Sequence, residues 1–92
     1  MNKEKKIDPE KEKILMEKCK EMFPQIRNFR YIINDEGTEI KFTADNVEEV
    51  QTNTDSNLSV DFIEFAEKLL NTEFEGISLI DGQYYFIHKF KD

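Results

Sequence analysis

The possible folds of this chain are limited most by two segments in which apolar residues recur at every second position around a turn signal. In the second segment, 77–90, the dipeptide Asp81-Gly82 is the strongest short signal for a β-hairpin. It predicts a two-residue type I′ turn that pairs Ile80 with Gln83. Apolar residues fall on both faces of this hairpin, with Ile77, Leu79, Tyr84, Phe86, His88 and Phe90 on one face and Ile80, Tyr85 and Ile87 on the other.

The first segment, 29–43, predicts another antiparallel hairpin around a four-residue loop at 34–37. This loop pairs Ile33 with Thr38. A three-residue loop would instead set Ile33 opposite Glu39 and mix apolar with charged residues on one face. The pattern therefore favours the longer loop, which gives the pairs Tyr31 with Ile40 and Phe29 with Phe42 on the same face as Ile33.

Two helices are predicted from apolar residues at helical spacing. The first begins with Asp8 as its N-cap and Pro9 at the first helical position. Pro24 ends this helix near Met22 or Phe23. The second helix begins near Ser59, and its buried side carries Phe62, Ile63, Phe65, Ala66, Leu69 and Leu70.

The element order α-β-β-α-β-β predicts an α+β fold, in which two helices pack on an antiparallel sheet made of two β-hairpins. Residues 1–7 are expected to form a flexible N-terminus, and residues 8–92 a single domain. The polar stretch 44–58 is predicted to be a loop with one helical turn, started by a capping box of Asp45 and Glu48. The predicted core contains Leu15, Met22, Phe29, Tyr31, Phe42, Phe62, Phe65, Leu69, Leu79 and Phe86.

Composition indicates a folded protein of the cytoplasm. Hydrophobic residues make up 38% of the chain and aromatic residues 12%, which is more than a disordered acidic tail would hold. One cysteine, Cys19, allows no internal disulfide and suits a reducing compartment. The N-terminus lacks the apolar run of a signal peptide, and no stretch approaches the ~20 apolar residues of a membrane span.

Acidic residues are concentrated in one part of the chain. The stretch 35–81 holds thirteen Asp and Glu against two Lys, and the net charge of the whole chain is −7. Such an imbalance favours a basic partner surface, and it disfavours direct binding of nucleic acid. Loops present interaction residues on a rigid scaffold, so the expected partner-binding residues are Asp35, Glu36, Asp45, Glu48, Glu49 and Asp55.

These properties predict a small acidic interaction or inhibitor protein that binds a basic, nucleic-acid-binding surface of another protein. The profile is similar to that of phage and mobile-element proteins that inhibit nucleases, of the anti-CRISPR and anti-restriction types. An alternative is a binding module that dimerises or recognises a partner through the apolar outer face of the C-terminal hairpin, where Ile80, Tyr85 and Ile87 lie. Salt separates the two, because only the electrostatic interface weakens steeply as ionic strength rises.

A second alternative comes from the segment 53–64. Its oxygen-bearing side chains at the first, third, fifth and ninth positions, with Val60 at the eighth and Glu64 at the twelfth, resemble the calcium loop of an EF-hand. That resemblance implies a calcium-binding regulatory module. Leu58 stands where the family has the glycine of the sharp turn, so we expect no tight calcium site.

The residues that could catalyse a reaction have simpler explanations. His88 alternates with Phe86 and Phe90, which places it at a sheet edge or partly inside the protein rather than as a general base. Cys19 falls on the apolar stripe of the first helix, as a small core residue would. The sequence therefore predicts no catalytic residues, no cofactor and no metal site.

Overall fold

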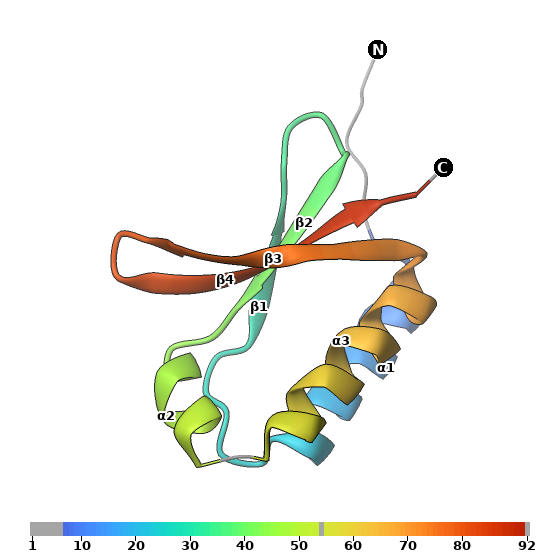
Figure 1. Ribbon diagram of the computed structural model, residues 1–92. Coiled ribbons are helices and arrows are strands. Elements are labelled where there is room, and N and C mark those ends of the chain that lie inside the picture. Colours follow the sequence, from blue (N-terminus) through green and yellow to red (C-terminus); the bar gives the residue numbers. More distant parts are fainter. Residues whose placement is uncertain (1–6, 54, 92) are drawn as a thin grey trace.

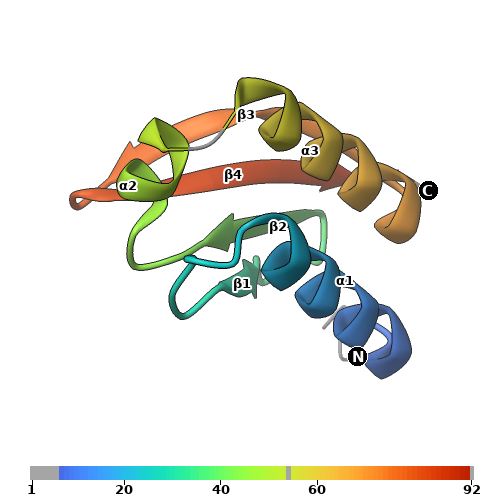
Figure 2. The ribbon, with the colours of Figure 1, turned by 90° about the horizontal axis from the view of Figure 1, so that it is seen from below.

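The structure is a computed structural model that describes residues 7–53 and 55–91, apart from the side chain of Ser56, and it has the predicted α+β fold. The helices of this part of the chain lie on one side of a four-stranded antiparallel sheet (Figure 1). Two of them, α1 and α3, run antiparallel to each other beneath the sheet (Figure 2). The elements in chain order are α1 (Pro9–Met22), β1 (Arg30–Ile33), β2 (Glu39–Thr43), α2 (Val47–Thr52), α3 (Ser56–Leu70), β3 (Thr72–Ile80) and β4 (Gln83–Phe90).

Helix α1 begins as predicted. The Asp8 carboxylate accepts a hydrogen bond from the Glu10 N–H at 2.9 Å, and Pro9 occupies the first turn, where its missing N–H costs nothing. The helix ends at Met22. Residues 1–6 of the expected flexible N-terminus lie outside the described residues, whereas Ile7 is buried in the core, so the packed domain begins before Asp8.

The C-terminal hairpin has the predicted turn and register. Asp81 and Gly82 both have positive φ, at 52° and 77°, as a type I′ turn requires. Strand β3 is longer than the sequence indicated, because it begins at Thr72 rather than near Ile77. A bulge between Phe74 and Gly76 interrupts the alternation there, which hides the first half of the strand from a search for period two.

The register predicted for the first hairpin is wrong by two residues. Ile33 pairs with Ile40 rather than with Thr38, and Tyr31 pairs with Phe42. The Asn34 side chain fixes this register, since its Oδ1 accepts hydrogen bonds from the N–H groups of Thr38 and Glu39 at 2.9 and 3.0 Å. A slip of two residues leaves every side chain on its original face, so the hydrophobic pattern could not exclude it.

The segment 44–58 contains more helix than predicted. Helix α2 covers Val47–Thr52, and α3 begins at Ser56 rather than near Ser59. The predicted capping box is wrong, because Asn46 is the N-cap of α2 and makes no side-chain capping bond. Its amide instead accepts from the Arg27 N–H and donates to the Gln25 carbonyl, at 2.9 and 2.8 Å, and so ties α2 to the segment after α1.

The sheet has the order β1-β2-β4-β3, which places β2 and β4 in its centre. His88 on β4 is therefore buried rather than at a sheet edge. Leu15, Ile40, Phe42, Ala66 and Leu70 form the main buried cluster, and most of the other predicted core residues pack partly buried around it. The assignment of Leu79 to the core is wrong, because this side chain is 59% exposed.

Candidate functional site

The structure separates the six predicted partner-binding residues into two groups. Asp35 and Glu36 lie exposed in the loop between β1 and β2, at the top of Figure 1. The other four follow the opposite end of β2, and five residues of strand, about 17 Å, lie between the groups. That second group is Asp45, Glu48, Glu49 and Asp55.

Asp45 is already paired within the molecule. Its Oδ1 lies 2.9 Å from Nη1 of Arg30, and its Oδ2 accepts a weaker bond from the Asn28 amide at 3.4 Å. The hydrogen bond from Arg30 is the main reason why the pKa of Asp45 is lowered. Because Arg30 neutralises this carboxylate locally, Asp45 offers a partner less charge than its exposure suggests.

Asp55 is the N-cap of α3. Its carboxylate accepts a hydrogen bond from the Asn57 N–H at 2.9 Å and satisfies one of the unpaired donors of the helix's first turn. This role accounts for the residue type at position 55. Asp55 remains exposed, so its charge still contributes to the surface field.

The side chains of Glu48 and Glu49, unlike those of Asp45 and Asp55, have no structural role within the described part of the protein. The inward side of α2 is set by Val47 and Val50, which are buried, and the two glutamates therefore project outward. Helix α3 continues this acidic character with Asp61 and Glu64, both exposed and both missed as candidates from the sequence. The signal that could have found them is the composition of 42–67, which contains no Lys, Arg or His.

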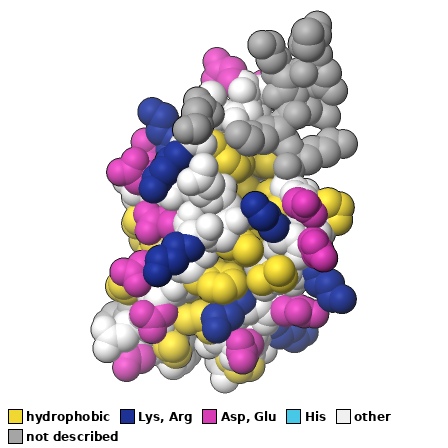
Figure 3. Space-filling view, turned by 90° about the vertical axis from the view of Figure 1, so that its right-hand side faces the viewer, with side chains coloured by type: hydrophobic (Ala, Val, Ile, Leu, Met, Phe, Trp, Pro, Cys, Tyr) yellow, Lys and Arg dark blue, Asp and Glu magenta, His cyan; other side chains and the backbone are white. Residues whose placement is uncertain are grey.

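The side of the molecule that lies at the right of Figure 1 carries charges of both signs. There, Lys and Arg side chains are interspersed with Asp and Glu (Figure 3). Helix α1 contributes pairs of this kind, such as Lys18 and Glu21 at 3.6 Å. The described part of α2 and of the first half of α3 carries negative charge without Lys or Arg, and we call it the acidic surface, defined as Glu48, Glu49, Asp55, Asp61 and Glu64.

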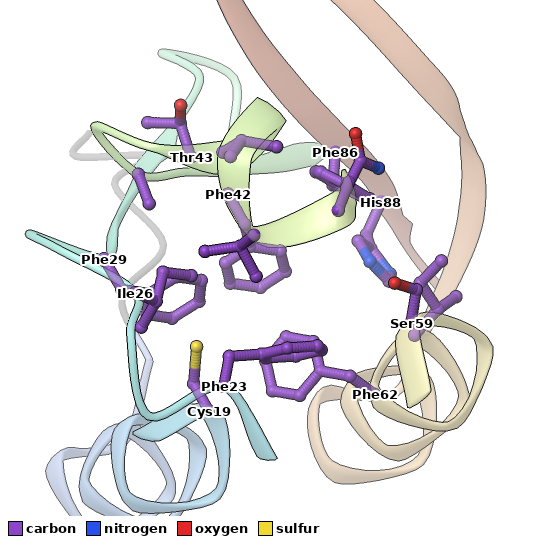
Figure 4. A pocket seen from close by; sticks show the side chains of 15 residues that line it. Cys19, Phe23, Ile26, Phe29, Phe42, Thr43, Ser59, Phe62, Phe86 and His88 are labelled. Carbon is purple, nitrogen blue, oxygen red and sulfur yellow. The ribbon is translucent and has the colours of Figure 1, made fainter. Parts of the chain in front are cut away.

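An apolar pocket lies next to the acidic surface, between the helices and the sheet (Figure 4). It encloses about 60 Å³, and five elements or their flanking segments line it. The side chains that line it are mostly apolar or aromatic: Cys19, Phe23, Ile26, Phe29, Phe42, Thr43, Ala44, Val47, Val50, Gln51, Ser59, Phe62, Ile63, Phe86 and His88.

The two residues of the pocket with reactive side chains are held in unreactive states. Burial lowers the pKa of His88 to about 4, so its imidazole is neutral and only weakly basic at pH 7. Its Nδ1 lies 3.2 Å from the Thr72 hydroxyl, and its ring packs edge-on against Phe42. Burial also raises the pKa of Cys19 to about 12, which keeps the thiol protonated. These properties suit a pocket that accepts an apolar group.

The EF-hand resemblance of 53–64 does not extend to the structure. Thr54 lies outside the described residues, but the backbone from Ser56 onward is α-helical. An EF-hand loop must instead wrap its alternate oxygen ligands around one ion. A helix turns those side chains to different sides, so the segment does not have the conformation of an EF-hand loop. In the ranges that the structure describes, no three His, Cys, Asp or Glu residues are grouped as a metal site would require.

The apolar residues of the alternative interface lie on the outer face of the sheet. Ile80, Tyr85 and Ile87 alternate along the hairpin with residues such as Phe86, which faces the helices and lines the pocket. Ile80 is exposed, while Tyr85 and Ile87 are partly buried.

No protein-family model, curated protein or solved structure matches this chain. Its own residues therefore carry the functional argument. Within the described ranges, no helix has the length and apolar character needed to cross a membrane.

Proposed function

We propose that this protein binds a partner protein that carries a basic surface, and that it does so through the acidic surface of α2 and α3. The observation that carries the proposal is the concentration of negative charge in α2 and the first turns of α3. Glu48, Glu49, Asp61 and Glu64 are exposed, and no Lys, Arg or His occurs from 42 to 67. The only cation that reaches an acidic residue of this segment at ion-pair distance, within the described part of the chain, is Arg30 on Asp45.

A surface of this kind attracts cations over a distance of about one Debye length, ~8–10 Å at physiological salt. It repels nucleic acid, whose phosphates carry the same sign of charge. A nucleic-acid-binding protein presents the opposite surface and is the partner class that fits best. Inhibition of such a protein, as by the phage-encoded inhibitors of restriction and CRISPR nucleases, is the biological role we propose for this binding.

The test is affinity capture with matched charge-reversal baits. Wild-type protein, the double variant Glu48→Lys/Glu49→Lys and the double variant Glu17→Lys/Glu21→Lys are immobilised separately and exposed to lysate. The two variants change the net charge equally, but the second changes α1, outside the acidic surface. Captured proteins are identified by mass spectrometry, and their affinities are then measured with purified components.

We expect a partner that is retained by wild type and by the α1 variant and lost to the α2 variant. Exposed ion pairs contribute about 0.2–1 kcal/mol each, and reversal adds repulsion, so the affinity should fall roughly ten- to a hundredfold. Salt at about 0.5 M should weaken the wild-type complex in the same direction. Equal binding by all three baits at high salt would show that the acidic surface is not the interface. Circular dichroism confirms that each bait is folded.

A second candidate is self-association through the outer face of the sheet. The observation that favours it is the exposure of Ile32 and Ile80 on a face that no described helix covers. Apolar contacts of this kind are insensitive to salt. Sedimentation at low and high ionic strength therefore distinguishes this candidate from the electrostatic one.

A further inference from the structure

The β3–β4 hairpin extends beyond the helices that cover the rest of its inner face (Figure 1). Ile77 pairs with Phe86, and Leu79 pairs with Tyr84. Cross-strand partners share a face, and Phe86 lines the pocket on the helix side of the sheet, so Ile77 and Leu79 point to that side as well. They are nevertheless 49% and 59% exposed. Two large apolar residues on the core side of a sheet thus lack a covering layer.

This uncovered apolar surface is continuous with the apolar pocket. Phe86 belongs to both, because it lines the pocket and pairs directly with Ile77. Val47 of α2 lines the same pocket, and so does Ser59 of α3, which Figure 4 shows on the side away from Phe29. We call the pocket together with the exposed apolar residues that adjoin it through Phe86 the groove, and define it as Val47, Ser59, Ile77, Leu79, Phe86 and the pocket behind them.

The charge around the groove selects among possible occupants. The segment 42–87, which contains α2, α3 and most of the β3–β4 hairpin, holds one Lys or Arg, namely Lys68, against ten Asp and Glu. Glu48, next to Val47 of the groove, is exposed. A second copy of this chain would bring the same negative elements against each other, which costs energy. A cationic segment gains from the same field.

The size of the pocket defines the anchor that such a segment needs. Its volume of about 60 Å³ exceeds the ~10–15 Å³ that holds one water molecule. It is well below the ~150 Å³ of a cavity that binds benzene. The pocket therefore fits the end of an aliphatic side chain, such as Leu or Met, better than an aromatic ring.

We propose that the groove anchors the basic partner, by binding a cationic segment that inserts an aliphatic side chain between α2, α3 and the β3–β4 hairpin. This inference rests on the proposed function and deepens it. The acidic surface attracts and orients the segment, and burial of the anchor against Ile77, Leu79 and Phe86 supplies the specificity. The partner is then recognised by a pairing of Lys or Arg with an aliphatic residue, and not by charge alone.

The probe is a fluorescein-labelled peptide of about sixteen residues, made of Lys and Leu with Leu at the spacing of one helix face. Its two matched controls replace Leu by Ala or Lys by Glu. Binding to the purified protein is followed by fluorescence anisotropy. We expect the Lys/Leu peptide to bind at least about tenfold more tightly than either control, because only this peptide supplies both charge and anchor.

Two variants test the groove, each with a control on the same type of element. Leu79→Thr removes an exposed groove residue, and Ile32→Thr removes a side chain of similar exposure, 51%, from an edge strand on the other face. Ser59→Leu fills the pocket mouth, while Asn57→Leu adds the same side chain at an exposed position of α3. The two groove variants should each lose about tenfold in affinity and the two controls should lose none. If Ser59→Leu disturbs folding, the affinity of Leu79→Thr relative to Ile32→Thr still tests whether the peptide binds the groove.

Three results would overturn the inference. Equal affinity in all groove and control variants would show that the groove is not the site. If the variant Glu48→Lys/Glu49→Lys still weakened binding in that case, the acidic surface alone would be the interface, and the proposed function would stand. Failure of the Lys/Leu peptide to bind at millimolar concentration would remove the cationic occupant. Sedimentation of wild type as a dimer that Leu79→Thr dissociates would assign the groove to a second copy.

Discussion

Removal of the buried His88–Thr72 pair should reduce the loss of folding stability that the wild-type protein shows as the pH falls below neutrality. The perturbation is the double variant His88→Leu/Thr72→Val. Both side chains are buried, and Nδ1 of His88 lies 3.2 Å from the Thr72 hydroxyl. Replacing His88 alone would leave that hydroxyl buried without its partner, at a cost unrelated to pH. Changing both groups removes the titrating group and avoids this cost.

The magnitude follows from the pKa. Burial lowers the pKa of His88 from 6.5 to about 4, and the Glu67 carboxylate acts in the opposite direction. Between these values the unfolded chain binds a proton that the folded chain excludes, so stability is fully present above pH 6.5 and is lost as the pH falls toward 4. From pH 7 to pH 5 this one group should cost the wild type about 2 kcal/mol of unfolding free energy.

Urea unfolding at pH 7 and at pH 5 measures the difference. Carboxylates titrate in both proteins, so their contribution cancels when the loss in the variant is subtracted from the loss in wild type. We expect the variant to lose about 2 kcal/mol less than wild type, or about 8–16 °C less in melting temperature. Thr72→Val alone keeps the imidazole and should retain the wild-type loss. An identical loss in wild type and double variant would show that the folded protein does not exclude the proton from His88.

Two other predictions test the register of the first hairpin and the chemistry of the pocket. Asn34→Ala removes the side chain that binds the N–H groups of Thr38 and Glu39, and should lower the unfolding free energy by about 1–2 kcal/mol. The control Asp35→Ala, in the same loop, should change the unfolding free energy by less than about 0.5 kcal/mol. Equal effects of the two variants in chemical denaturation would contradict the role of Asn34. Cys19, with its pKa raised to about 12, should react with iodoacetamide at pH 8 at least about a hundredfold more slowly in the folded protein than in urea, as followed by mass spectrometry, and a similar rate in both states would show that the pocket exposes the thiol.

The candidate site was only partly visible in the sequence. The inventory of carboxylates and the absence of cations from 42 to 67 can be read directly from the residues. The sequence does not show which of these carboxylates form ion pairs within the protein, because partners such as Asp45 and Arg30 lie fifteen residues apart in the chain. The groove is harder still to predict, since α1, β2, α2, α3 and β4 or their flanking segments all line its pocket. No local pattern marks residues that meet only when the sheet and the helices pack.

The sequence alone determined the elements whose signals are local. Asp81-Gly82 fixed the second hairpin and its register, because the positive φ angles of a type I′ turn depend on the two turn residues themselves. Asp8 and Pro9 likewise fixed the start of α1, through one capping bond and one pre-set φ. The period of two also assigned each strand residue of the first hairpin to its correct face.

Only the tertiary structure decided what depends on distant partners. The observed register of the first hairpin differs by two residues from the predicted one, because the Asn34 side chain binds the loop backbone. A shift of two residues keeps every side chain on its face, so the apolar pattern is the same in both registers. Leu79 has the pattern of a core residue, yet its side chain is 59% exposed because the described helices leave it uncovered. His88 is buried because β2 and β3 flank β4 on both sides, an order set by packing. Burial depends on how the sheet and helices pack. The alternation along one strand specifies the face of the sheet to which each side chain points, but not whether a helix covers that face.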